Sequence, residues 1–398
     1  MMRRSFNRRG PKKYLFQSSR RSRSAGSFGF GSRIDPAKFI NKAIYEEEDE
    51  SFVSKHQFHD FKIDRRLVSA IANKGYKAPT PIQDQIIDHI IDGLDVVGIA
   101  NTGTGKTAAF LLPLSNKILQ NPREQILIVA PTRELAIQID QEFKSLTRGM
   151  GIFSVCCVGG AGLGRQMSEL RRNYNVIIGT PGRLKDLVGR RMIHLSRFNT
   201  VVLDEADRMF DMGFVNDTRF ILNGMPVDRQ TLFFSATVSN DIERMIGEFT
   251  HNALRISVRS RDTSKNVEQD VIKIEPGKTK LEVLNNLLNQ EEFNKVLIFG
   301  RTKRGVEKIS RNLIGKGFKV ESIHGNKNNN QRQRALGMFK DNRVQVLVAT
   351  DIAARGLDIA DVSHVINYDI PATYEDYIHR IGRTGRWNKR GMALTFLD

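Results

Sequence analysis

A glycine-rich segment at residues 101–107 has the composition of a phosphate-binding loop. It reads Asn-Thr-Gly-Thr-Gly-Lys-Thr, follows the apolar run Val96–Ala100 and precedes a helix-like stretch, AAFLLPL. Glycines permit positive φ, which lets backbone N–H groups face phosphate oxygens, and a helix N-terminus favours negative charge. We expect Lys106 to reach the outer phosphates and Thr107 to hold Mg²⁺. The general pattern has glycine at position 100, where this chain has alanine.

Two adjacent acids follow another apolar run. Asp204 and Glu205 come directly after Val201–Leu203. Ligands of open parallel sheets bind outside the carboxyl ends of the strands, and an acid that holds Mg²⁺ through a water belongs there. Glu205 is the candidate group that polarises an attacking water. An acidic residue after a strand can also be a helix N-cap. The presence of the phosphate-binding loop in the same chain is what favours a Mg²⁺ site here.

Short apolar runs that alternate with amphipathic segments must position these residues. Continuous apolar runs indicate strands covered on both faces, and their alternation with helices indicates βαβ units and a parallel sheet. The first half has the runs Val96–Ala100, Ile126–Ala130, Val176–Ile178, Val201–Leu203 and Leu232–Phe234. After a polar stretch the pattern restarts with the runs Val296–Phe299, Val320–Ile323, Val346–Ala349, Val365–Tyr368 and Ala393–Leu397.

The chain is therefore predicted to be an α/β protein with two tandem domains, each a parallel sheet flanked by helices. We place a disordered basic arm with an acidic linker at residues 1–50 and the first domain at 51–258. A flexible linker is expected at 259–270 and the second domain at 271–398.

The net charge is unevenly distributed along the 398 residues. Lys and Arg number 62 against 44 Asp and Glu, which gives +18. Ten of the basic residues lie in residues 1–33, which contain no acid, and the acidic run Glu46–Glu50 follows. This composition predicts a disordered arm that binds polyanions through counterion release. A solubilising tail and an organellar transit peptide are the alternatives.

Several classes are excluded or disfavoured by composition. No apolar run approaches the roughly 20 residues of a membrane span, and no apolar segment near the N-terminus predicts a secretory signal. Cys156 and Cys157 are adjacent and lie in the apolar run Phe153–Val158, which predicts reduced thiols in a buried strand. We expect a cytoplasmic protein without membrane contact.

The acidic motif gives the chain a family resemblance. Residues 204–207 read Asp-Glu-Ala-Asp, and the chain resembles the DEAD-box ATP-dependent RNA helicases of superfamily two over roughly residues 58–398. The resemblance implies two RecA-like domains, with ATP and Mg²⁺ as cofactors. The family's first motif tolerates A-x-T-G-x-G-K-T, which accounts for Ala100.

The resemblance also implies a nucleotide site. Residues 75–83 look like the family's Q motif, in which Gln83 would read the adenine edge, and Phe58 matches an aromatic residue that stacks on adenine. Asp358, in a fifth motif that begins at Asp351, is expected at the ribose. The nucleotide-binding residues so implied are Phe58, Tyr76, Gln83, Thr102, Gly103, Thr104, Gly105, Lys106, Thr107 and Asp358.

Further motifs imply catalysis and coupling. Residues 377–386 match the sixth motif, with Arg386 as the arginine finger, Arg383 at the γ-phosphate and His379 bridging towards the acidic motif. Ser235-Ala236-Thr237 resembles the motif that links the ATP site, through Asp207, to strand separation. The implied catalytic residues are Lys106, Asp204, Glu205, His379, Arg383 and Arg386.

The implied RNA contacts follow predicted strands or begin predicted helices, where phosphates can be held. They are Pro131, Thr132, Arg133, Gly160, Thr180 and Arg183 in the first domain, and Arg301, Thr302, Gly325, Arg332 and Thr350 in the second. Backbone contact of this kind gives little sequence selectivity. The segment Asn326–Asn330 departs from the family, which has Asp after His-Gly, and could strengthen phosphate contact or loosen the helix start.

The sequence thus predicts an RNA-dependent ATPase that opens short duplexes locally and non-processively or remodels ribonucleoproteins. An ATP-gated RNA clamp with little unwinding carries the same motifs, and a DNA translocase shares the fold. We expect a monomer that acts on RNA, including within ribonucleoprotein or ribosome-assembly complexes.

Overall fold

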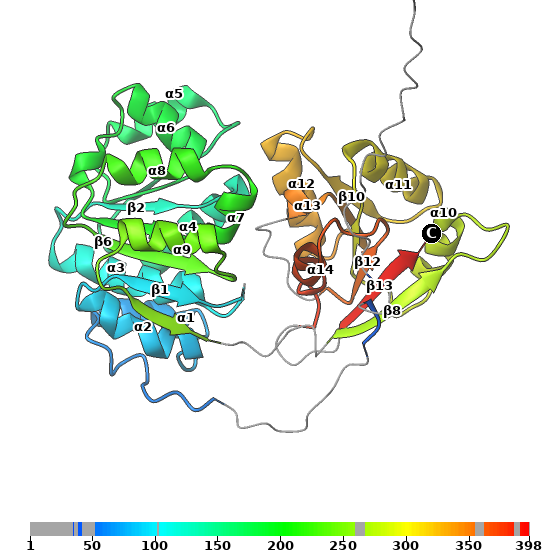
Figure 1. Ribbon diagram of the computed structural model, residues 1–398, viewed down its shortest axis with the longest axis horizontal. Coiled ribbons are helices and arrows are strands. Elements are labelled where there is room, and N and C mark those ends of the chain that lie inside the picture. Colours follow the sequence, from blue (N-terminus) through cyan, green and yellow to red (C-terminus); the bar gives the residue numbers. More distant parts are fainter. Residues whose placement is uncertain are drawn as a thin grey trace, which may run out of the picture. The chain divides into compact units, whose positions relative to one another are not determined.

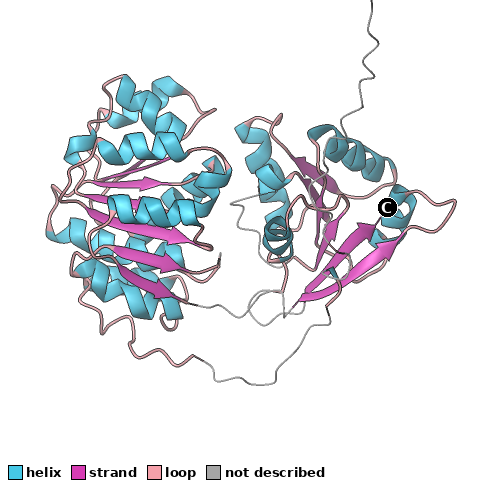
Figure 2. Cartoon of the chain, viewed as in Figure 1, coloured by secondary structure: helices cyan, strands magenta, loops and turns pink. Residues whose placement is uncertain are grey.

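The computed structural model describes residues 35, 39–41, 52–101, 103–258, 267–354, 362–385 and 391–397. Within these ranges lie two parallel β-sheets, each flanked by helices (Figure 1, Figure 2). The predicted α/β class with two sheets is therefore confirmed. The basic residues 1–33, the acidic run Glu46–Glu50 and residues 259–266 of the expected linker lie outside the described residues.

The first sheet has the strand order β3-β4-β2-β5-β6-β1-β7, and all neighbouring strands pair in parallel. The five runs expected in this half coincide with β1, β2, β4, β5 and β6, with shifts only at their ends. The strands are β1 (Val96–Ile99), β2 (Ile126–Val129), β3 (Ser154–Cys157), β4 (Val176–Gly179), β5 (Thr200–Leu203), β6 (Gln230–Ser235) and β7 (Leu254–Ser257).

Helices cover both faces of this sheet, because alternate strand residues enter different cores. Ile126 and Ile128 pack in a cluster with α2, α3 and α4, whereas Leu127 and Val129 pack in a cluster with α6, α8 and α9. The helices are α1 (Arg65–Asn73), α2 (Pro81–Ile91), α3 (Lys106–Gln120), α4 (Arg133–Leu146), α5 (Leu163–Leu170), α6 (Pro181–Gly189), α7 (Ala206–Asp211), α8 (Val215–Asn223) and α9 (Asn240–Phe249).

The second sheet has the order β10-β11-β9-β12-β13-β8, again with parallel pairing throughout. Its strands are β8 (Val267–Lys273), β9 (Val296–Phe299), β10 (Val320–Ile323), β11 (Val346–Ala349), β12 (His364–Asn367) and β13 (Gly391–Leu397). Its helices are α10 (Lys280–Leu288), α11 (Lys303–Gly315), α12 (Asn329–Lys340), α13 (Asp351–Ala354) and α14 (Tyr374–Ile381). The runs expected at β9, β10 and β11 match the observed strands.

The linker expected at 259–270 is too long at its C-terminal end, because β8 already begins at Val267. Val267 and Gln269 are buried, whereas Glu268 and Asp270 are exposed. An edge strand with one solvated face alternates in this way. The polar residues of that face are what made residues 267–270 resemble a linker in the sequence.

The adjacent cysteines lie in β3, as expected, and both are free thiols. Burial raises the pKa of each thiol well above its ordinary value, so the thiolate is disfavoured. Among the helices of the described residues, none combines the length and the apolar character that crossing a membrane requires.

The close approach of β1 and β6 depends on a glycine. Gly98 pairs with Phe234 across the two strands, and a Cβ at residue 98 would lie 2.7 Å from the Phe234 ring carbons Cδ1 and Cε1. Because β1 leads into the phosphate-binding loop and β6 into Ser235-Ala236-Thr237, this contact sets the spacing of two predicted motifs.

We expect Gly98→Ala to lower the free energy of unfolding by about 1–3 kcal/mol, because the added methyl group overpacks the Phe234 ring. Gly247→Ala is the matched control. It lies inside α9 with no atom within 4 Å of the new Cβ, and alanine there should leave stability unchanged or raise it by up to about 1 kcal/mol. Denaturant unfolding measures both variants, and equal stability of Gly98→Ala and the parent would contradict the assignment.

Candidate active site

The predicted phosphate-binding loop (residues 100–105) joins β1 to α3. Gly103 and Gly105 have φ values of 89° and 93°, the left-handed region that glycine tolerates. The ammonium group of Lys106 is buried and donates a hydrogen bond to the Ala100 carbonyl, so this side chain covers the loop. Thr104 donates to the Asn101 carbonyl at 2.9 Å and closes the turn. The loop therefore presents backbone N–H groups, a helix N-terminus and a lysine, which suits phosphate.

Gln83, which is predicted to recognise adenine, contacts this loop directly. Gln83 is fully buried, and its Nε2 donates to the Gly105 carbonyl at 3.1 Å while its Oε1 accepts from the Thr80 N–H at 2.9 Å. A Cβ at residue 105 would lie 2.5 Å from Gln83 Nε2. The amide of Gln83 thus supports the start of α2 and the loop, a structural contact that the sequence analysis did not anticipate.

The two aromatic residues assigned to the nucleotide lie close together beside α2. Phe58 is almost fully buried, and its ring centroid lies 6.3 Å from that of Tyr76. The segment before Phe58 is fixed by Asp84, whose carboxylate accepts from the Lys55 and His56 N–H groups at 3.0 and 3.1 Å. Of the other nucleotide residues, Thr102 and Asp358 lie outside the described residues.

The acidic motif is a buried cluster of charge. Asp204 is only 2% exposed and Glu205 only 4%. Burial raises the pKa of Asp204 to about 7, an effect that Glu205 strengthens and Lys106 opposes. Glu205 has left-handed backbone dihedrals, φ 52° and ψ 51°, which are strained for a non-glycine residue. Its Oε2 accepts from Arg208 Nη1 at 2.8 Å, an ion pair that is also buried.

Asp207 joins the acidic motif to the Ser235-Ala236-Thr237 segment. Its Oδ2 accepts from the Ala236 and Thr237 N–H groups, each at 3.0 Å. The Asp207 N–H in turn donates to Ser235 Oγ at 3.2 Å, and Ser235 Oγ donates to the Thr237 carbonyl at 2.6 Å. Asp207 thus connects the segment after β5 to the segment after β6, the neighbouring strand.

The sixth motif is anchored by an arginine that the sequence analysis did not assign. Arg380 is 2% exposed and binds Asp351 through two bonds, Nε to Oδ1 at 2.5 Å and Nη2 to Oδ2 at 2.8 Å. Its Nη1 also donates to the Asp369 carbonyl at 2.7 Å. This bidentate pair fixes α14 to the start of α13. The sequence signal for this pair was Asp351, which begins the fifth motif, together with Arg380 inside the sixth motif.

The other assigned residues of this motif are only partly within the described residues. His379 is half-buried on α14, and Arg383 is 4% exposed just after that helix. Arg386, expected to be the arginine finger, lies outside the described residues.

In the first domain, the residues assigned to RNA converge at the carboxyl ends of three adjacent strands. Thr132, after β2, caps α4 by accepting from the Leu135 N–H at 3.2 Å. Gly160, after β3, has φ 72°, and a Cβ there would overlap the Arg133 guanidinium. The remaining members are Pro131 after β2, and Thr180 and Arg183 at the start of α6, with Arg183 Nη1 donating to Gln166 Oε1 at 2.9 Å.

In the second domain, the assigned residues also follow neighbouring strands. Thr302 caps α11 by accepting from the Gly305 N–H at 3.0 Å, and the Arg301 N–H donates to Asp369 Oδ2 at 2.7 Å. Gly325 follows β10 and Thr350 follows β11. Arg332 lies in the first turn of α12.

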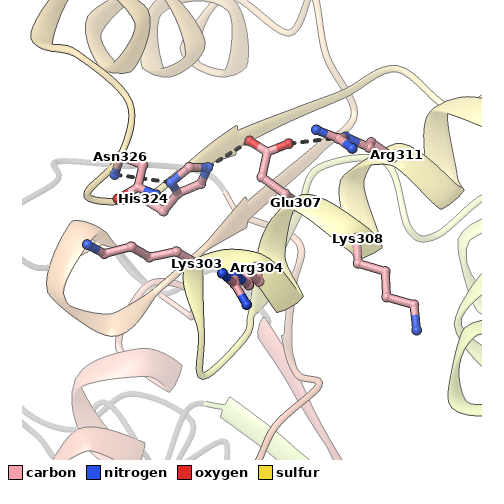
Figure 3. Close-up of a pocket in the computed structure, with 7 residues that line it drawn as sticks. All are labelled: Lys303, Arg304, Glu307, Lys308, Arg311, His324 and Asn326. Atoms are coloured by element: carbon pink, nitrogen blue, oxygen red, sulfur yellow. Dashed lines mark hydrogen bonds and ion pairs between the residues drawn. The ribbon is translucent and has the colours of Figure 1, made fainter.

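A basic cavity of about 420 Å³ lies beside these residues (Figure 3). His324 Nε2 is 2.7 Å from Glu307 Oε1, and the Asn326 N–H donates to His324 Nδ1 at 3.3 Å. With Nδ1 as acceptor, Nε2 carries the proton and donates to Glu307. The other residues that line the cavity are Lys303, Arg304, Lys308 and Arg311.

The departure from the family at Asn326–Asn330 does not loosen the helix start. Asn328 caps α12, since its Oδ1 accepts from the Gln331 N–H at 2.9 Å and Gln331 Oε1 accepts from the Asn328 N–H at 3.0 Å. Lys327 Nζ lies 3.5 Å from Glu321 Oε2. The capping box gives this segment a well-ordered helix N-terminus.

Both halves of the chain match known protein families. Residues 80–245 match the DEAD/DEAH box helicase family, and residues 279–388 match the helicase conserved C-terminal domain. The chain is 44% identical over 344 residues to ATP-dependent RNA helicase CshA of Listeria monocytogenes, covering 86% of this chain and 66% of that protein. It is 44% identical over 342 residues to DEAD-box ATP-dependent RNA helicase CshA of Bacillus subtilis, covering 85% and 69%.

Solved structures of similar fold carry nucleotide and RNA. Dbp5 of S. cerevisiae, bound to RNA and ADP BeF3, has a TM-score of 0.75 and 29% identity, over 86% of this chain and 89% of that one. Mss116p, bound to ssRNA and AMP-PNP, has a TM-score of 0.78 and 28% identity, over 88% and 76%. The two sheets are therefore tandem RecA-like domains, and the chain belongs to the DEAD-box family of superfamily-two helicases.

Proposed function

We propose that the chain is an ATP-dependent RNA helicase that hydrolyses ATP to ADP and phosphate and opens short duplexes locally, without processive movement. The observation that carries this proposal is the hydrogen-bond network of Asp207 with Ser235 and Thr237, which joins a nucleotide motif to a neighbouring strand end. We place it in the cytoplasm as a monomer that acts on RNA, including within ribonucleoprotein or ribosome-assembly complexes.

The nucleotide assignment is supported by the chemistry of the first domain. Lys106 and the backbone N–H groups of the phosphate-binding loop suit the phosphates. The Thr107 hydroxyl and the Asp204 carboxylate are oxygen donors of the kind that Mg²⁺ prefers, and a cation would relieve the burial penalty on the Asp204 charge. Mg²⁺ held by Thr107, and by Asp204 through water, would neutralise phosphate charge. Glu205 would orient the attacking water, because one buried oxygen is already fixed by Arg208.

The second domain would complete the catalytic site. Arg383 and Arg386 would stabilise charge on the transferring phosphoryl group, and His379 would bridge towards the acidic motif. The Arg380–Asp351 pair holds their helix in place beforehand. ATP and RNA would each contact both domains, so their binding should be reciprocally coupled.

The RNA assignment is supported by the clustering of the predicted residues at strand ends in each domain. These positions offer helix N-termini and arginines for phosphates, and contact with the 2′-hydroxyl would distinguish RNA from DNA. An ATP-gated clamp is the second candidate, since the Asp207 network would connect the nucleotide site to the segment after β6 in a clamp as well.

The helicase proposal predicts that RNA accelerates ATP hydrolysis and that Glu205→Gln slows it strongly. Loss of the carboxylate should lower turnover by about 10²–10⁴-fold while ATP and RNA still bind. Steady-state ATPase rates with and without RNA, together with equilibrium binding, measure this. Glu248→Gln, at a partly exposed surface acid paired with Arg219, is the control. Equal rates with and without RNA would contradict coupling, and stimulation by DNA alone would favour a translocase.

A second variant separates the helicase from the clamp. Ser235→Ala removes the acceptor for the Asp207 N–H and the donor to the Thr237 carbonyl. We expect RNA-stimulated ATP hydrolysis to stay within several-fold of the parent, while strand displacement per ATP falls by about tenfold. A short-duplex displacement assay measures this, with Ser69→Ala on the exposed face of α1 as control. Absence of displacement by the parent chain would instead support the clamp.

The raised pKa of Asp204 predicts a pH-dependent stability. The folded protein keeps a proton on Asp204 that the unfolded chain releases near its ordinary pKa of 3.8. Stability therefore falls as pH rises from about 4 to about 7, and the full penalty is present above pH 7. Without nucleotide, Asp204→Asn should raise the free energy of unfolding at pH 8 by about 1–3 kcal/mol and change it little at pH 4. Denaturant unfolding at both pH values tests this; a variant less stable than the parent at pH 8 would refute it.

A further inference from the structure

A short segment that precedes the first domain in sequence lies against the second domain. Phe39 has no exposed surface, and its ring centroid lies 4.8 Å from that of Tyr377, edge to face at 63°. Tyr377 belongs to α14 and is also fully buried. A phenylalanine this completely buried is part of a core, so residues 39–41, which we call the latch, contribute to the packing of the second domain.

The latch also extends the second sheet beyond its edge. The Asn41 N–H donates to the Gln269 carbonyl at 3.0 Å, and the Gln269 N–H donates to the Asn41 carbonyl at 2.8 Å, an antiparallel bridge. Gln269 lies in β8, the outermost strand of that sheet (Figure 1). The bridge therefore covers part of the sheet edge. Between Phe39 and Asn41, Ile40 is 54% exposed, as expected for alternating side chains of extended backbone.

The two contacts of the latch meet at one helix. The Tyr377 hydroxyl donates to Gln269 Oε1 at 2.9 Å, so the ring beneath Phe39 is bonded to the residue that pairs with Asn41. Three residues further along α14, Arg380 binds Asp351, and Arg383 follows the end of the helix. Phe39 therefore packs against the middle of the helix that directly precedes Arg383, the arginine assigned to the nucleotide.

We propose that Phe39 is a positioning residue for the ATPase reaction: the latch locks α14, and with it Arg383, into the second domain before the nucleotide is engaged. The proposal rests on the proposed function, because Arg383 matters only if ATP is the substrate. It gives residues N-terminal to the first domain a role in the second.

The latch also adds a connection between the two domains. The chain leaves the second domain at Asn41 and rejoins the first by Phe58, which lies in the core of that domain.

Residue-resolved hydrogen exchange in the full chain, without nucleotide or RNA, tests the docking. The Gln269 amide faces Asn41 rather than β13, so we expect it to be protected in the parent and in Ile40→Ala. In Phe39→Ala and in Asn41→Pro, which removes the donor N–H, its exchange should rise by about tenfold or more. Equal exchange in all four proteins would overturn the latch.

RNA-stimulated ATP hydrolysis by the same proteins tests the positioning. Phe39→Ala should lower kcat by about tenfold with little change in KM for ATP, because the phosphate-binding loop and Gln83 lie in the first domain. Phe39→Leu, which keeps an apolar side chain, should recover most of the activity, and Ile40→Ala should match the parent. Exchange that rises in Phe39→Ala without any fall in kcat would overturn the positioning role. A parent chain that hydrolyses no ATP would refute the proposed function instead, whereas the exchange result would stand.

Discussion

All strands of the first sheet run in parallel, and therefore all of them end at the same edge. The strand order alone therefore brings together the loop after β1, the acids after β5 and the segment after β6. The same constraint places Thr302, Gly325 and Thr350 together after β9, β10 and β11. A change that altered pairing in either sheet would disperse a whole site rather than one residue. Gly98 therefore bears on the site although it lies within a strand, because it sets the spacing of β1 and β6.

Burial gives the acidic residues their properties. Asp204 lies so deep that burial raises its pKa to about 7, and beside it Glu205 accepts a hydrogen bond from the buried Arg208 guanidinium. Removing one partner from such a buried group leaves the other uncompensated. Asp207 differs, because two backbone N–H groups from the next strand satisfy its carboxylate. One strand end thus holds three acids in different surroundings: one buried, one paired with an arginine, and one bonded to the segment after the neighbouring strand.

The sequence predicted the elements that carry strong patterns and missed those whose partners lie far away. The runs at β9, β10 and β11 were predicted because a parallel strand buried on both faces is continuously apolar. β8 was read as linker because an edge strand alternates, and Glu268 and Asp270 are polar. The role of Arg380 is not evident from the sequence, because it depends on Asp351. Only the fold brings the Asp351 carboxylate within 2.8 Å of the Arg380 guanidinium. Phe39 and Ile40 are adjacent apolar residues in a short segment, and no local pattern shows that the first is buried while the second is exposed.

Preorganisation connects the fold to the proposed reaction. An arginine that stabilises a transferring phosphoryl group is most effective when its position is fixed before the reaction, since ordering a long side chain later would consume binding energy. In the second domain α14 is held from three directions: by Asp351 through Arg380, by Gln269 through the Tyr377 hydroxyl, and by Phe39 through the Tyr377 ring. The first two contacts come from within the domain, whereas the third comes from the chain that leads into the other domain. Positioning of the helix and connection of the domains therefore depend on the same few residues.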